Sequence, residues 1–426
     1  MPTINIADKE TLDRVEELCK LTYDAVAETG RIFGFIERGN VLNPDTRIEY
    51  IGTNKDYTPF SLDASSGTMD LGSWRDFEWL EENRPAMVRS DGTLDYWLDS
   101  TDYTKRIDGS DSDAANTDYD GHAMAWIPKI YKYEENIGID RIVKFSMHHL
   151  EGYDPVGFID PDGAELDGVW IPLFYGWQDS AGKMRSIANG DIATHSLNTS
   201  QEWTAISANG DRAKFFGGPI VETLIDLMIL FSKKTDLQAA FGNGNRSGYI
   251  SSDTTTHGKT ANTCSNMGQF YGTSDGKSIN RVFHSMVLIT QNQYQRDPYL
   301  LCVRGRFKAS KDYKYDLTGE SYFDTGIDML PAPESGRWSY PNHWESIKGF
   351  GALPHPTPEK GSTSIGRCDG VYRSPSQASV LAVSRRFCWC SSGATGGPCA
   401  LDLGGSAGDA GWYIGASVLL LPPPPV

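Results

Sequence analysis

Apolar residues recur along the chain in two periods, one typical of helices and one typical of strands. Between residues 8 and 28 they follow spacings of three and four, beginning at Leu12 and Val15, and Asp8 is placed to cap the segment. This pattern predicts an N-terminal amphipathic helix. Its apolar seam suits an oligomerisation or docking element, and it also suits an ordinary helix packed on its own chain.

The clearest helical pattern covers residues 219–234. Pro219 suits the first turn, one wide face is apolar, and Lys233 with Lys234 complements the helix dipole at the C-terminal end. We expect a buried scaffold helix at this point of the chain.

Short aromatic runs separated by turns predict strands elsewhere. Residues 31–121 are of this kind, with turns such as Asp91-Gly92, and predict a small β-rich adaptor region. Two similar phrases follow, Trp126-Ile127-Pro128 and Trp170-Ile171-Pro172. Because proline cannot donate to a strand ladder, each predicts an edge or bulged strand. The apolar run at 418–421 predicts a closing core strand.

The composition narrows the class of function. Of 426 residues, 56 are acidic and 39 are basic, so the net charge is −17, and a nucleic-acid backbone would be repelled. The first residues lack the regions of a secretory signal, and no apolar run is long enough to cross a bilayer. The abundance of Gly, Tyr and Trp is nevertheless typical of extracellular binding proteins. We therefore expect a virion component that is made in a host cytoplasm and neither binds nucleic acid nor inserts into a membrane.

Candidate metal ligands are scattered. The seven cysteines match no zinc-site or redox-pair spacing, and most are expected to be free thiols. Alternating Asp residues over 108–120 could ligate calcium, but the stretch lacks the Gly and the closing Glu of an EF-hand loop, which favours a solvated loop. His148-His149 and the other histidines have no partner at ligand spacing. We expect no metal and no cofactor.

The last fifty residues hold an unusual mixture of side chains. An apolar run at 380–383 precedes a segment in which Arg385, Phe387 and Trp389 stand among small residues. Such side chains dominate binding hot spots, because they offer large contact area or bidentate hydrogen bonds at modest entropic cost. The segment therefore predicts a displayed contact surface. The alternative is that the aromatic side chains belong to the core and the arginines are merely solvated.

These residues also resemble a known family. The order of Trp389-Cys-Ser-Ser-Gly393, Leu401-Asp-Leu403 and Trp412-Tyr-Ile-Gly415 is similar to the C-terminal part of C-type-lectin-fold variable proteins, which diversity-generating retroelements alter in phages and bacteria. Ser384-Arg-Arg-Phe387 replaces the family's Arg-Gly-Gly-Ser, as expected of a variable segment, and Ala416-Ser417 replaces its closing Ser-Arg.

Upstream phrases extend the resemblance to tail-fibre and other virion proteins of gut phages. They are the two Trp-Ile-Pro phrases, Gly182-Lys-Met-Arg-Ser-Ile187, and Asp95-Tyr-Trp-Leu98 with the Asp102-Tyr-Thr that follows it. The resemblance implies a homotrimer on the exterior of the virion, for example at a tail-fibre tip. Its N-terminal region would contact other virion proteins, and its distal sites would bind a host cell-surface protein or glycan.

The architecture implied is α+β. It has an N-terminal helix in residues 1–30, a β-rich adaptor over 31–121, and a C-type-lectin-like domain over 122–426, on a scaffold shared with formylglycine-generating enzymes. A displayed binding segment would occupy about 380–415. The ligand-binding residues would be Ser384, Arg385, Arg386, Phe387, Trp389, Ser391, Ser392, Thr395, Asp409 and Tyr413, with Tyr372 and Arg373 beside them.

The function that follows is non-covalent, non-enzymatic receptor binding, and three alternatives are open. Cys390 and Cys399 lie near the position of the reactive pair of formylglycine-generating enzymes, but no base is poised to make a thiolate. A glycosidase would need two facing carboxylates, such as Asp402 and Asp409. A structural capsid or fibre decoration protein would keep exposed loops without binding a receptor.

Overall fold

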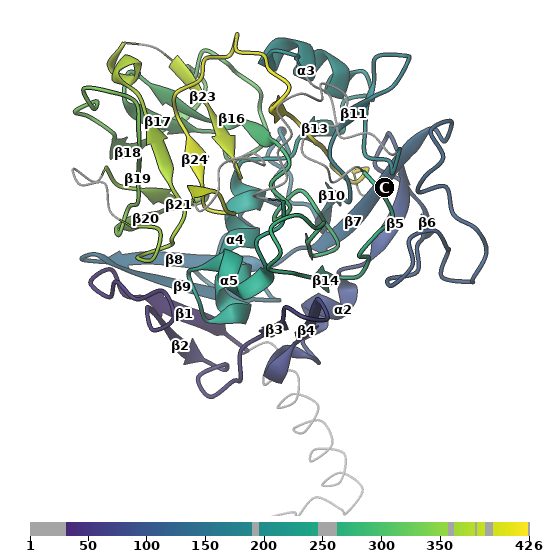
Figure 1. The fold of residues 1–426 in the computed structure, drawn as a ribbon, viewed down its shortest axis with the longest axis horizontal. Helices are drawn as coiled ribbons and strands as arrows, with labels where there is room; N and C mark the ends of the chain where they lie inside the picture. The colour runs from purple at the N-terminus through teal and green to yellow at the C-terminus, as the bar shows by residue number, and fades with distance from the viewer. Residues whose placement is uncertain are drawn as a thin grey trace, which may run out of the picture.

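The computed structural model of the chain describes residues 31–189, 196–245, 262–356, 362–379, 381–387 and 395–424. Strands make up 33% of the structure and helices 11%, with four α-helices in the described part and a curled β half-barrel (Figure 1). The expected α+β fold, with an N-terminal helix before a C-type-lectin-like domain, is therefore wrong. The physical reason is that short aromatic runs between Gly and Pro turns persist through the whole chain, which favours strands throughout. The expected helix at 8–28 lies outside the described residues.

A four-stranded antiparallel sheet forms one side of the molecule. Phe35 of its second strand faces Tyr50 on one neighbour and Val143 on the other, and all three side chains are buried. In spatial order the strands are β2 (Ile48–Gly52), β1 (Phe33–Glu37), β9 (Asp140–Ser146) and β8 (Tyr131–Ile137).

A six-stranded sheet contains both Trp-Ile-Pro phrases. They form β10 and β7, neighbours in the middle of the sheet, so the expectation of edge or bulged strands is wrong. Each proline is the last residue of its strand, where a missing N–H interrupts no ladder. In spatial order the strands are β13 (Ala213–Phe215), β26 (Val418–Leu420), β10 (Gly168–Pro172), β7 (Gly121–Pro128), β5 (Pro85–Arg89) and β6 (Leu94–Trp97).

Strand β26 confirms the closing core strand that the apolar run at 418–421 predicts. The turn between β5 and β6 forms at Asp91-Gly92, as the sequence predicts, with Gly92 at a φ of 84°. This left-handed conformation favours glycine.

The largest sheet lies in the C-terminal half. It has eight strands, with β25 (Ile414–Gly415) paired to one side of β16. The other seven, in spatial order, are β18 (Phe323–Asp328), β17 (Arg306–Ala309), β16 (Tyr294–Val303), β23 (Leu381–Arg386), β24 (Leu401–Asp402), β22 (Val371–Arg373) and β19 (Arg337–Ser339).

Helix α4 (Pro219–Ser232) confirms the predicted scaffold helix. Pro219 occupies its first turn, every residue of the helix is buried, and Lys233 ends it in a left-handed conformation. Figure 1 shows α4 near the centre of the molecule, between the largest sheet and the four-stranded sheet. The other described helices are α2 (Glu78–Glu82), α3 (Thr199–Ser207) and α5 (Leu237–Phe241), with short 3-10 turns η1 (Gly72–Trp74) and η2 (Pro375–Ala378).

One core connects most of these elements, since a single cluster of buried apolar side chains runs from Phe33 to Leu421. Strands of residues 31–121 pair with strands of residues 122–426, so the four-stranded and six-stranded sheets both cross the expected boundary at 121/122. In the part of the chain described, no helix has both the length and the apolar character to cross a membrane.

Four two-stranded sheets complete the described structure. They are β3 (Ser61–Asp63) with β4 (Thr68–Asp70), β11 (Trp177–Gln178) with β12 (Met184–Arg185), β14 (Phe270–Tyr271) with β15 (Arg281–Val282), and β20 (Trp344–Ile347) with β21 (Gly351–Pro354).

Candidate ligand-binding site

The expected binding segment begins inside the largest sheet. Ser384 and Phe387 are 0% exposed and Arg386 is 2% exposed; β23 is an inner strand, paired with β16 and β24, and Phe387 joins the main core. Arg386 donates hydrogen bonds to Asp297 and to Glu222, the latter at 2.5 Å. The expectation that these three side chains are displayed is therefore wrong.

Arg385 is also withdrawn from solvent, at 7% exposure. Its guanidinium lies 3.0 Å from a carboxylate oxygen of Asp402 and 3.8 Å from one of Asp409, and 5.4 Å from the ring centre of Tyr294. The two carboxylates of the glycosidase alternative thus face one arginine, and its charge is balanced within the protein. Display of Arg385 is likewise contradicted.

Other expected residues lie near this cluster. Tyr413 packs against Tyr294, and Tyr372 of β22 lies beside Asp402 of the neighbouring parallel strand β24. Arg373 is 2% exposed and donates to the carbonyls of Met329 and Pro331, which contradicts a place at the surface. Tyr372, Thr395, Asp409 and Tyr413 are partly exposed, whereas Trp389, Ser391 and Ser392 lie outside the described residues.

The cysteine alternative gains no support from the environment of Cys399. This thiol is 3% exposed, and burial raises its pKa well above the usual range although Arg367 lies beside it. A protonated, buried thiol is a poor nucleophile. Cys390 lies outside the described residues, and among those described no cluster of His, Cys, Asp and Glu is suited to a metal ion. In the 108–120 stretch, Asp108 and Asp111 are exposed and bond to Ser110 and Lys105.

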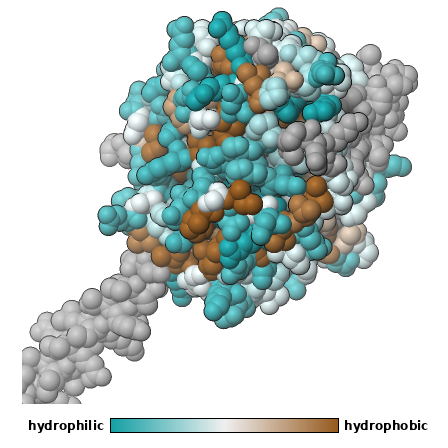
Figure 2. All heavy atoms as spheres, turned by 90° about the vertical axis from the view of Figure 1, so that its left-hand side faces the viewer, coloured by the Kyte–Doolittle hydropathy of each residue, from teal (hydrophilic) through white to brown (hydrophobic). Residues whose placement is uncertain are grey.

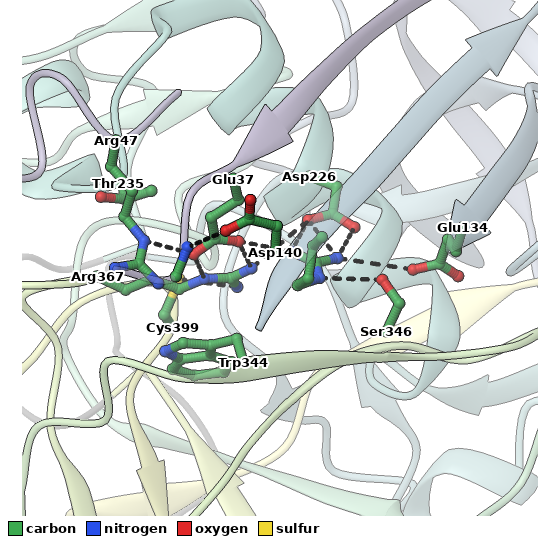
Figure 3. A network of polar contacts seen from close by, with 12 residues as sticks. Glu37, Arg47, Glu134, Asp140, Asp226, Thr235, Trp344, Ser346, Arg367 and Cys399 are labelled. Carbon is green, nitrogen blue, oxygen red and sulfur yellow. Dashed lines mark hydrogen bonds and ion pairs between the residues drawn. The ribbon is translucent and has the colours of Figure 1, made fainter. Parts of the chain in front are cut away.

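A buried network of charges joins the four-stranded sheet to α4 (Figure 3). Glu37 of β1 accepts hydrogen bonds from Arg47, Arg141 and Arg367, and Arg141 also contacts Asp226 of α4 at 3.0 Å. All five side chains are about 1% exposed. The guanidinium groups hold the pKa of Glu37 well below its usual value despite burial, which by itself would raise it. This network is scaffold, because its charges are satisfied internally.

A different feature of the surface is built on the six-stranded sheet. Trp170 of β10 pairs directly with Trp126 of β7, and the backbone N–H of Trp126 donates to the backbone carbonyl of Arg84 at 2.8 Å. Directly opposed residues of antiparallel strands point to the same face. Trp97 of β6 pairs with Ala86, two residues after Arg84, and therefore shares that face. The sheet thus gathers three tryptophans and an arginine on one side.

The three indole rings form a concave floor. Trp170 is 4% exposed, and its indole N–H donates to the carbonyl of Gly92 at 3.0 Å. The ring of Trp126 lies 4.7 Å from it at an angle of 57°, and that of Trp97 lies 5.8 Å away at 46°. Gly168 makes room for Trp126, since a Cβ at this position would lie 2.3 Å from the ring. Trp97 and Trp126 are partly exposed.

The C-terminal segment completes one wall of this hollow. The N–H of Leu421 donates to the carbonyl of Arg212 at 2.9 Å, and a Cβ on Gly92 would lie 2.0 Å from the carbonyl oxygen of Leu421. Figure 1 shows the C-terminal end beside β5 and β7. The cavity volume is about 470 Å³, within the range of small-ligand sites. We call it the tryptophan groove, lined by Glu82, Arg84, Gly92, Thr93, Leu94, Trp97, Trp126, Trp170, Pro422 and Pro423.

The groove offers polar groups that the described part of the protein does not use. The indole N–H groups of Trp97 and Trp126 have no hydrogen-bond acceptor there, and neither Glu82 nor Arg84 forms an ion pair. Arg84 uses only its Nε–H, on a backbone carbonyl at 3.0 Å. Burial and the neighbouring Glu78 raise the pKa of Glu82, and the charge of Arg84, which is near enough to act on this carboxylate, partly opposes the rise. Donors and an acceptor therefore surround an apolar aromatic floor.

A second, more polar hollow of about 650 Å³ adjoins the groove and shares Arg84 and Trp97 with it. His284 lies in its wall, 3.0 Å from the hydroxyl of Tyr103, and burial lowers the pKa of this histidine to about 3. A neutral histidine bonded on both ring nitrogens has a structural role. An extended ligand could pass from the groove across Arg84 into this hollow.

The chain matches no known family model and no curated protein. The candidate site therefore rests on geometry alone. The sequence analysis did not identify the groove, although the sequence holds a signal for it. The two Trp-Ile-Pro phrases form antiparallel strands in which Trp126 and Trp170 are directly opposed, so both tryptophans lie on the same face of the sheet.

Proposed function

We propose that this chain is a recognition protein of a virus particle that binds a host-surface ligand non-covalently in the tryptophan groove. The observation that carries the proposal is the solvent-open floor of Trp97 and Trp126 with the unpaired side chains of Glu82 and Arg84 at its rim. Tryptophan and arginine are the residue types that most often dominate binding energy.

Recognition is favoured over catalysis by the placement of the reactive groups. Asp402 and Asp409 both face Arg385, and the thiol of Cys399 is buried with a raised pKa. In the groove itself, Glu82 is the one carboxylate among the lining residues, whereas glycoside hydrolysis ordinarily needs two.

The virion context is supported by the sequence phrases that resemble gut-phage virion proteins. Asp95-Tyr-Trp-Leu98 and the two Trp-Ile-Pro phrases contribute all three tryptophans of the groove. Three of the upstream motifs that extend the resemblance thus supply residues of the proposed site.

Adsorption of assembled particles tests the proposal. Particles carrying Trp97→Ala with Trp126→Ala should adsorb to host cells at least about 30-fold more slowly than wild-type particles, because two hot-spot aromatics are lost. Trp412→Ala is the matched control, since Trp412 is a partly exposed tryptophan in the C-terminal segment. Unchanged adsorption by double-variant particles of normal protein composition would contradict the proposal.

A structural decoration protein is the second candidate. Ile137 and Ile139, at the turn between β8 and β9, are 58% and 49% exposed. This turn lies on the face seen in Figure 2, where hydrophobic atoms gather among hydrophilic ones. Such exposure suits contact with another particle subunit. If Ile137→Ser with Ile139→Ser lowered the particle content of this protein while the groove variants adsorbed normally, this candidate would be favoured.

A further inference from the structure

We infer that the ligand of the tryptophan groove is a carbohydrate chain whose pyranose rings lie on Trp97 and Trp126; this inference rests on the proposed function. A sugar ring has an apolar face of C–H groups and an edge of hydroxyl groups. The apolar face matches an exposed indole ring, and the hydroxyl edge matches polar groups placed around it.

The hydrogen-bonding groups at the rim select this class of ligand. Glu82 is exposed, has no ion-pair partner among the described residues, and can only accept hydrogen bonds while ionised. Arg84 and the two indole N–H groups can only donate. A ligand that satisfies all of them must both donate and accept along one edge. Each sugar hydroxyl does both.

A proline-rich peptide is the strongest competing occupant, because aromatic grooves also bind polyproline helices. The chain's own Pro422 and Pro423 already form one wall of the groove. Proline offers carbonyl oxygens but no N–H. Such a peptide could therefore accept from Arg84 and the indoles but would leave the carboxylate of Glu82 unmatched. The donor and acceptor balance favours carbohydrate.

The adjoining hollow extends the site along the chain of the ligand. The two hollows share Arg84 and Trp97, and Ser100, Thr101 and Gln269 line the second. The Thr101 hydroxyl already donates to Asp99 and the Gln269 amide to Leu80 and Asn83, so these two residues offer a ligand their oxygen atoms as acceptors. Hydroxyl and amide groups suit further sugar residues. We expect affinity to rise with oligosaccharide length until both hollows are filled.

The test uses the purified, fluorescently labelled full chain on intact host cells. Periodate cleaves the vicinal diols of surface carbohydrate, and proteinase K removes exposed protein. We expect periodate to lower the bound fluorescence at least ten-fold and proteinase K to leave it unchanged, with no competition from a free decaproline peptide. Binding that survives periodate and is lost after proteinase K, or that decaproline displaces, would overturn the carbohydrate inference.

Substitutions of two exposed polar residues, Glu82 and Arg84, test the carbohydrate inference without disturbing the packed core. Glu82→Gln and Arg84→Ala should each weaken cell binding by about ten-fold, since a hydrogen bond to a charged group is lost, and Glu151→Gln, an exposed glutamate elsewhere, should not. If wild-type chain binds no cells, or if Trp97→Ala with Trp126→Ala binds as well as wild type, the proposed function fails as well. If binding depends on the tryptophans but resists periodate, the carbohydrate class alone fails.

Discussion

Replacing Arg386 with alanine separates a buried structural role from a displayed binding role. The arginine contacts Glu222 at 2.5 Å and also bonds to Asp297, and the three side chains are 0–2% exposed. The substitution leaves two buried carboxylates without their guanidinium partner. We expect a loss of stability and unchanged ligand affinity.

The size of the loss follows from the burial of both partners. Removing one member of a buried ion pair costs about 3–5 kcal/mol, and two carboxylates lose their partner here, so we expect the upper part of this range. A loss of about 4 kcal/mol raises the equilibrium constant for unfolding by roughly a thousand-fold. The exposed pair of Arg75 and Asp70, with side chains 66% and 67% exposed, is the control. Arg75→Ala should cost at most about 1 kcal/mol.

Urea unfolding followed by tryptophan fluorescence gives the free energy of unfolding of each variant.

The difference in stability between Arg386→Ala and wild type should depend on pH in a definite direction. Burial raises the pKa of Glu222, and the charge of Arg386 opposes this rise. Removing the Arg386 guanidinium therefore raises the pKa of Glu222 further. The folded variant then takes up a proton more readily than the unfolded chain as pH falls, and the deficit between Arg386→Ala and wild type should shrink on acidification. A deficit below about 1 kcal/mol near neutral pH, or reduced cell binding at unchanged stability, would refute the reasoning.

Three other predictions follow from single residues. Burial lowers the pKa of His284 to about 3, so below about pH 6.5 only the unfolded chain binds a proton at this histidine. As pH falls, urea unfolding should therefore show the stability of His284→Gln rising relative to wild type by about 1.4 kcal/mol per pH unit. A stability difference that does not change with pH would contradict this. Gly92→Ala should cost about 1–3 kcal/mol more than Gly109→Ala in the same assay, since both glycines have φ near 85° but only a Cβ on Gly92 meets Leu421; equal costs would argue against the packed tail. Cys399 should resist iodoacetamide in the native protein and react after unfolding, as mass spectrometry would show; rapid native alkylation would revive the nucleophile hypothesis.

The elements that could be predicted are those whose pattern is local. Helix α4 carries a long, unbroken helical period and a proline in its first turn, and β26 is a short apolar run before prolines. Neither depends on a partner for its identity. The place of the two Trp-Ile-Pro strands in the sheet could not be predicted, because a proline at the end of a strand and one inside it look alike until the register is known.

The site could not be predicted for a related reason. Arginine is ordinarily exposed, and the burial of Arg386 depends on Glu222 and Asp297, which are 164 and 89 residues away in the sequence. The groove likewise requires Trp126 to pair with Trp170 across two strands. Residue types identified the kind of side chain that binds ligands, but only strand pairing shows which of them reach the surface.

The most direct test of the central claim is the response of individual tryptophan indole N–H signals to carbohydrate. The measurement is a nitrogen–proton NMR titration of the full chain with oligosaccharides released from the host surface. We expect the signals of Trp97 and Trp126 to shift and those of the fully buried Trp74 and Trp79 to stay fixed. Shifts confined to Trp412, with Trp97 and Trp126 unmoved, would contradict this claim and return recognition to the C-terminal segment.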